Sequence, residues 1–157
     1  MNSELNMTKQ SLNGIDQALQ DRKILRAFRS GGGLRVVRIE DSRDGPLRGY
    51  GEDPNLMPAL HDASDDYLAG GREYSEVYDK LKPHYLTGTT QAEDRLDLWV
   101  LQGHKLWAER KDGKVKVEAR TFEDKRVVSA LGDDFKTAYA SLSELVTNEA
   151  FEKANGF

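Results

Sequence analysis

The chain has 157 residues, enough for one domain, and 38% of them are hydrophobic, which suffices for a core and excludes wholesale disorder. It has no cysteine, so disulfides, thiolate metal sites and cysteine nucleophiles are excluded, and its net charge of −4 disfavours nucleic acid as a partner. Neither a signal peptide nor an apolar run near the roughly 20 residues of a membrane span occurs, so we expect a cytoplasmic protein without membrane association.

The N-terminal part predicts a polar tail followed by a helix. Residues 1–10 are expected to be disordered, and residues 11–157 to form a single α+β domain. Apolar residues at helical spacing predict a helix from Ser11 to Arg29. The three glycines at 31–33 then stop this helix before a strand. Because a phosphate loop needs a helix after the glycines, this order argues against one.

The middle of the chain predicts a hairpin and a helix. Strands are expected at 34–40 and 47–52, around a turn at Asp44-Gly45, and a helix follows up to Gly70. The stretch 72–91 is irregular in pattern and contains Tyr74, Tyr78 and Tyr85. Residues 95–102 fit either a strand or a helical turn.

The C-terminal part predicts three antiparallel strands between residues 104 and 131. A turn at Asp112-Gly113 sets the first register and a turn at Glu123-Asp124 the second. Together they place six residues on one face: Leu106, Ala108, Val117, Ala119, Val128 and Ala130. A helix then follows, with Asp133 or Asp134 as its N-cap and with Phe135, Ala138, Leu142 and Leu145 on its buried side.

Residues 34–70 and 104–147 share an order of two strands, a Gly-acid-Asp stretch and a helix. An internal repeat of two pseudo-symmetric ββα units explains this order, and so does the general preference of strand-to-helix junctions for Gly and Asp. The order resembles the ββα layout of HicB-like antitoxins, which implies a regulatory protein.

The sequence offers no catalytic constellation, and we predict neither a cofactor nor a metal site. His61 and Asp65, one helical turn apart, are the best metal ligands available, but two ligands are fewer than most sites need. A solvated acidic helix face explains them better.

Trp107 is the most informative aromatic residue. The hairpin register places it opposite the core, on a side that also receives Val127 and Leu131. One interpretation is that a helix or a second subunit covers this face. The other is an aromatic groove for a ligand, with Trp99 nearby and the three tyrosines of 72–91 at its rim.

We therefore expect a non-enzymatic binding or regulatory protein that self-associates as a homodimer. The first alternative is a small-ligand-binding domain or small enzyme that uses the aromatic groove. The second is an antitoxin-like regulator whose arginines at 35, 38, 43 and 48 contact nucleic acid. The sequence does not identify the ligand or the partner.

Overall fold

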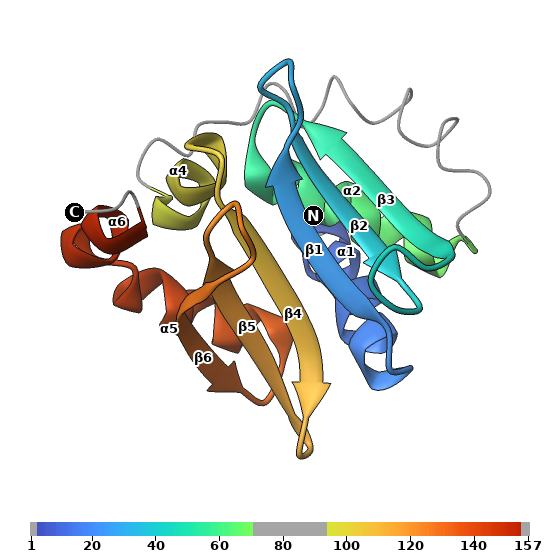
Figure 1. Cartoon of the computed structure of the whole chain (residues 1–157). Coiled ribbons are helices and arrows are strands. Elements are labelled where there is room, and N and C mark those ends of the chain that lie inside the picture. Colours follow the sequence, from blue (N-terminus) through green and yellow to red (C-terminus); the bar gives the residue numbers. More distant parts are fainter. Residues whose placement is uncertain (1–2, 71–93, 155–157) are drawn as a thin grey trace.

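The computed structural model describes residues 3–70 and 94–154. This part has an α+β fold, with five helices and one six-stranded antiparallel sheet (Figure 1). The expected segment of tyrosines at 72–91 lies outside the described residues. No helix in the described ranges is long and apolar enough to cross a bilayer.

The elements fall into two halves with a similar order. The first half comprises α1 (Ser3–Gln20), β1 (Ile24–Arg29), β2 (Arg35–Glu40), β3 (Leu47–Asp53) and α2 (Leu56–Leu68). The second half comprises α4 (Arg95–Leu101), β4 (Lys105–Lys111), β5 (Lys114–Arg120), β6 (Arg126–Gly132), α5 (Phe135–Leu145) and α6 (Asn148–Ala154). Each half thus contains a helix, three strands and one or two further helices.

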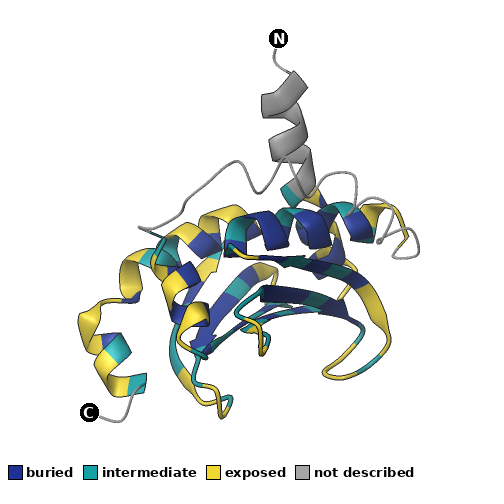
Figure 2. Ribbon diagram, turned by 90° about the horizontal axis from the view of Figure 1, so that it is seen from above, coloured by how far each residue is buried: buried dark blue, intermediate teal, exposed yellow. Residues whose placement is uncertain are grey.

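The sheet has the strand order β3-β2-β1-β4-β5-β6, so β1 and β4 join the halves at its centre and β3 and β6 form its edges. β1 and β4 run antiparallel, with Arg26 opposite Trp107. A rotation of about 180° around an axis perpendicular to the sheet therefore relates the second half to the first. The helices pack on one side (Figure 2), where one cluster of buried side chains includes Ile15, Trp99 and Phe135.

Fine details of the strands also correspond between the halves. The ladder shifts register between Ile39 and Glu40 in β2, and between Ala119 and Arg120 in β5. The turn after each shift contains an aspartate with positive φ, 59° at Asp44 and 67° at Asp124. This correspondence concerns structure, and the internal repeat of residues 34–70 and 104–147 stays a prediction.

The predicted register of the second half is confirmed. Ala108 lies opposite Val117, and Leu106 opposite Ala119, across the turn at Asp112-Gly113. β6 follows in the predicted pairing, with Val117 opposite Ala130 and Ala119 opposite Val128. The two-residue turn at Asp112-Gly113 and the alternation of side chains determine the register of β4 and β5, since a slip of one residue would turn the apolar side chains to the other face. The second turn is longer than the expected two residues, because Thr121 N–H donates to Lys125 O, and the register shift beside it keeps Val128 opposite Ala119.

The helix expected at 11–29 is wrong at both ends. α1 already begins at Ser3 and ends at Gln20, and residues 24–29 form strand β1. The chain turns at Arg22, which has a φ of 68°. Leu25 and Phe28 satisfy helical spacing by coincidence, whereas Leu25 and Ala27 alternate into the core as in a strand.

The glycines at 31–33 consequently lie between two strands rather than after a helix. Ser30 N–H donates to Leu34 O at 2.8 Å, and Gly33 takes a φ of 85°. A phosphate loop needs a helix N-terminus after the glycines, and here a strand follows them. The glycines therefore do not form a phosphate loop, although they follow a strand rather than the expected helix.

The structure decides between the two alternatives for residues 95–102 and corrects the expected C-terminal helix. Residues 95–101 form a helix, and the Asp94 carboxylate caps it by accepting from Leu96 N–H and Asp97 N–H. The C-terminal helix is divided into α5 and α6, and Asp134 is confirmed as the N-cap of α5. Leu145, expected on the buried side, is 47% exposed, because α5 ends there and Val146 enters the core instead.

Candidate interaction surface

The side of the sheet opposite the helices is the candidate surface, and we call it the open face. It is defined by a row of cross-strand partners that runs over all six strands: Tyr50, Arg38, Arg26, Trp107, Glu118 and Ser129. Directly opposed residues of an antiparallel sheet share a face, so these side chains all point away from the helices. Polar residues dominate the row, and Trp107 is its largest apolar member.

In the first half, Glu40 is the centre of an ion-pair network on the open face. Its side chain is fully buried, and it accepts from Arg26 Nε at 2.8 Å and from Arg38 Nε at 2.8 Å. Burial alone would raise the pKa of Glu40, but the hydrogen bonds from Arg26 and Arg38 outweigh it and lower the pKa. The carboxylate is therefore charged and held between two guanidinium groups.

Glu118 has the same role in the second half. Its carboxylate lies 2.9 Å from Lys116 Nζ and 2.6 Å from Arg120 Nη2, and it is almost fully buried. Burial raises its pKa, and the hydrogen bonds from Lys116 and Arg120 lower it further than burial raises it. Two buried glutamates, one in each half, thus anchor the cations of the open face.

Trp107 lies between these two networks. Its ring is half-buried, and the Arg120 guanidinium lies 4.1 Å from the ring centroid, within the range of a cation–π contact. The buried indole Nε1–H has no hydrogen-bond partner in the described part of the chain. The side chain is therefore fixed by neighbours on its own face and has one unused donor.

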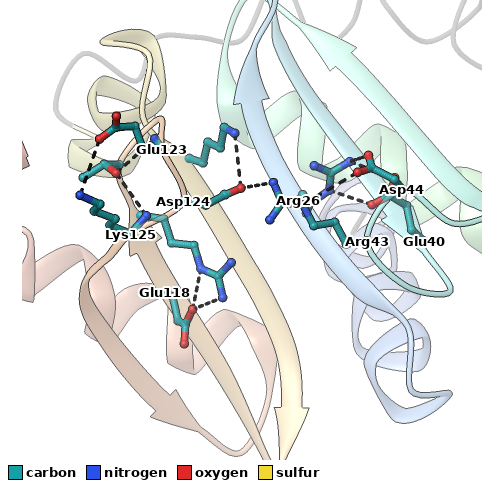
Figure 3. A network of polar contacts seen from close by, with 11 residues as sticks. Arg26, Glu40, Arg43, Asp44, Glu118, Glu123, Asp124 and Lys125 are labelled. Atoms are coloured by element: carbon teal, nitrogen blue, oxygen red, sulfur yellow. Dashed lines mark hydrogen bonds and ion pairs between the residues drawn. The ribbon is translucent and has the colours of Figure 1, made fainter.

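Two turns bring the halves together over the open face. Figure 3 shows Arg43, from the turn after β2, reaching across to Asp124, in the turn after β5, where the two form an ion pair. Asp124 also lies 3.7 Å from Lys105, and Arg26 lies 3.2 Å from Asp44. The face is thus a connected set of paired charges rather than a field of one sign.

The predicted interface residues do not all lie on this surface. Leu131 does, at 57% exposure, and Val127 is half-buried beside the register shift of β6, where it also packs against the core cluster. Trp99 does not: it is fully buried among the helices, and its Nε1–H donates to Lys105 O and Arg120 O. Trp99 and Trp107 therefore have no common groove.

The two candidate metal ligands both lie on α2. Burial lowers the pKa of His61 to about 4, so this imidazole is neutral near pH 7. Asp65 is half-buried one turn later. Within residues 3–70 and 94–154, no group of three or more side chains is arranged to hold a metal ion.

The four arginines of the antitoxin-like alternative are dispersed and paired. Arg35 is buried on the helix side of the sheet, where its Nε lies 2.6 Å from Asp97. Arg38 pairs with Glu40, Arg43 with Asp124 and Arg48 with Asp41. Each positive charge has a carboxylate close by, which weakens the field that a phosphate backbone would meet.

Sequence reasoning missed Arg26 and the role of Glu40. The helical spacing of residues 11–29 places Arg26 in a helix, which conceals its position between Arg38 and Trp107 in the sheet. A local signal existed, since Arg38 and Glu40 alternate on one face of β2 as Glu118 and Arg120 do in β5.

No family model, no curated protein and no solved structure matches the chain.

Proposed function

We propose that the chain is a non-enzymatic binding or regulatory protein that associates with a second copy of itself through apolar side chains of its second half. The observation that carries the proposal is Leu131, which is 57% exposed on the open face at the end of β6. Leu145, 47% exposed at the end of α5, adds an apolar side chain to the same half. A solvated strand face favours polar residues, so an exposed leucine on it is typical of a contact surface.

The electrostatics of the open face support self-association over binding of a highly charged partner. The cations around Glu40 and Glu118 are already paired within the chain. A surface of balanced, internally paired charges neither attracts a polyanion strongly nor repels a second copy of itself.

The test is sedimentation velocity over a broad concentration series, with wild type and Leu131→Asp. We expect wild type to self-associate reversibly and the variant to dissociate at concentrations where wild type is dimeric, because the new carboxylate loses its water on association. Leu68→Asp is the matched control, since Leu68 is 54% exposed on α2, which belongs to the first half. A wild type that stays monomeric throughout the series contradicts the proposal.

A further inference from the structure

The two edges of the sheet are not equally protected. β3 and β6 are the edge strands, and an edge strand presents N–H and C=O groups that can pair with another chain. Proteins block such edges with charged side chains, prolines or a covering element. The two strands can be compared directly, because they occupy equivalent places in the two halves.

The edge of β3 is blocked by α2. The Tyr50 N–H donates to the carboxylate of Asp66, on α2, at 2.9 Å, so it is not free for another strand. Arg48 and Glu52 add charges on either side of Tyr50. α2 comes this close because Gly51 has no side chain: a Cβ there would lie 2.0 Å from Ala59 O.

The edge of β6 lacks the carboxylate and the flanking charges, although α5 approaches the β6 backbone at Gly132, where a Cβ would lie 2.6 Å from Ala138 N. Its residues 127–131, VVSAL, contain neither a charge nor a proline. Counted from the N-cap of each helix, Leu145 in α5 occupies the position that Asp66 occupies in α2. Asp66 is the eleventh residue after Asn55, and Leu145 is the eleventh after Asp134. The second half thus has an exposed leucine where the first half has the carboxylate that accepts from the strand.

The sequence of β6 is complementary to itself in an antiparallel arrangement about Ser129. Val127 then lies opposite Leu131 of the second copy, and Val128 opposite Ala130. Just outside the strand, Lys125 lies opposite Asp133 of the second copy. These two side chains are 77% and 85% exposed. Within the chain Lys125 lies 3.9 Å from Glu123 and Asp133 lies 2.6 Å from Lys114, so an ion pair between copies would share or replace these exposed surface pairs.

We infer that β6 pairs antiparallel with β6 of a second copy, with Ser129 opposite Ser129, so that the two sheets become one. This inference rests on the proposed self-association and specifies how it occurs. Ser129 is the equivalent of Tyr50, whose N–H points away from the sheet, so the backbone groups of Ser129 point outward to the partner strand. The pairing covers Leu131 with an apolar residue of the other copy.

Other registers fit the strand less well. Centring the pair on Val128 would place Lys125 opposite Leu131, and centring it on Ala130 would place Val127 opposite Asp133. A shift by a single residue would turn the helices of the two copies to opposite sides of the joined sheet. Only the arrangement about Ser129 matches apolar residues with apolar residues and Lys125 with Asp133.

The test exchanges charges in the full chain and measures dimer dissociation by sedimentation velocity. Lys125→Asp alone places two acidic groups opposite each other, and Asp133→Lys alone places two basic groups opposite each other. Because each pair occurs twice in a symmetric dimer, each variant should weaken self-association by about tenfold. A mixture of the two variants restores both opposite-charge pairs, so we expect heterodimers of wild-type affinity.

Trp107→Ala is the discriminating control, since Trp107 lies two strands from the edge and should leave the β6 pairing intact. Dimers that resist both charge exchanges, or that dissociate in Trp107→Ala while the exchanges have no effect, overturn the β6 pairing but leave self-association standing. A monomeric wild type overturns self-association itself. Because Lys125 and Asp133 are exposed, the exchanges should not disturb folding, which urea unfolding of each variant verifies.

Discussion

In the first half, α2 lies directly on the backbone of β3, whereas in the second half the side chains of Val128 and Ala130 point from β6 toward α5. Gly49 and Gly51 of β3 are equivalent to Val128 and Ala130 of β6. The two register shifts establish this, because Gly49 pairs with Ile39 just before the first shift and Val128 pairs with Ala119 just before the second. A helix in contact with a strand backbone can bring a carboxylate to the strand's edge, as Asp66 does at Tyr50. In the second half α5 makes such a contact at Gly132, at the end of β6, where a Cβ would lie 2.6 Å from Ala138 N, and it has Leu145 rather than a carboxylate at the position of Asp66.

The largest expected loss of stability follows from replacing Gly51 of β3 by alanine, the residue at the equivalent position of β6. Gly51→Ala, which copies Ala130, places a Cβ 2.0 Å from Ala59 O, so α2 must move from its position. We expect the free energy of unfolding to fall by about 3 kcal/mol in urea titrations. Gly31→Ala is the control, because no atom lies within 4 Å of its added Cβ. A loss at Gly51 as small as that of the control contradicts the direct contact.

The second comparison concerns the two buried glutamates. Glu40→Gln leaves Arg26 and Arg38 facing each other across the strands without the carboxylate that joins them, and should cost about 2–3 kcal/mol. Glu118→Gln should cost about 1–2 kcal/mol, because Lys116 keeps Glu109 and Arg120 keeps the Trp107 ring. Around Glu40, Arg26 keeps the exposed Asp44, whereas Glu40 is the ion-pair partner of Arg38 in the described residues. Chemical denaturation at neutral pH measures both, and equal losses would show that these second partners contribute nothing.

The same two glutamates predict that the free energy of unfolding decreases at acidic pH. The pKa of each carboxyl is lower in the folded than in the unfolded chain, so its stabilisation is complete above the ordinary value of 4.5. That stabilisation is lost as the pH falls through the lowered folded-state pKa. Glu40→Gln should therefore flatten the acid limb relative to wild type.

Asp66 should have the opposite pH dependence, and it tests the cost of blocking the β3 edge. Burial raises its pKa from 3.8 to about 6, so between these values the folded chain holds a proton that the unfolded chain has released. Stability should fall as the pH rises through this window. Asp66→Asn should remove this fall and be more stable at pH 7 by about 2 kcal/mol. Stability curves of wild type and variant that run parallel from pH 3.8 to 6 contradict the assignment.

The smallest effect compares the two N-caps. The Asp134 carboxylate accepts from Thr137 N–H at 2.8 Å, whereas the Asn55 side chain makes no capping hydrogen bond. Asp134→Ala should cost about 1 kcal/mol, and Asn55→Ala only a few tenths. Thermal unfolding at low salt separates the two, and a reversed order would contradict the capping geometry.

Sequence patterns predicted the second half better than the first, for a physical reason. Asp112-Gly113 and alternating side chains define a hairpin locally, so β4, β5 and β6 follow in register. In β1, Leu25 and Phe28 also fit a helix, and nothing local decides between the two structures. The pairing of β1 with β4 connects residues far apart in sequence, so the position of Arg26 opposite Trp107 could be found only in the folded chain.

The candidate surface shows the same limit. The outward position of Trp107 followed from the hairpin register. The ion pairs of Glu40 with Arg26 and of Arg43 with Asp124 depend on which strands meet, which short-range patterns do not encode. Aromatic character groups Trp99 with Trp107, but residue type does not predict that Trp99 is fully buried.

The central pairing of β1 with β4 has a consequence for how the chain folds. Within each half, consecutive strands are joined by short turns, so their contacts are local and cost little chain entropy to form. The seam between β1 and β4, by contrast, closes a loop that contains most of the first half and everything up to α4. Loop closure at this seam, rather than formation of either half, should therefore set the refolding rate.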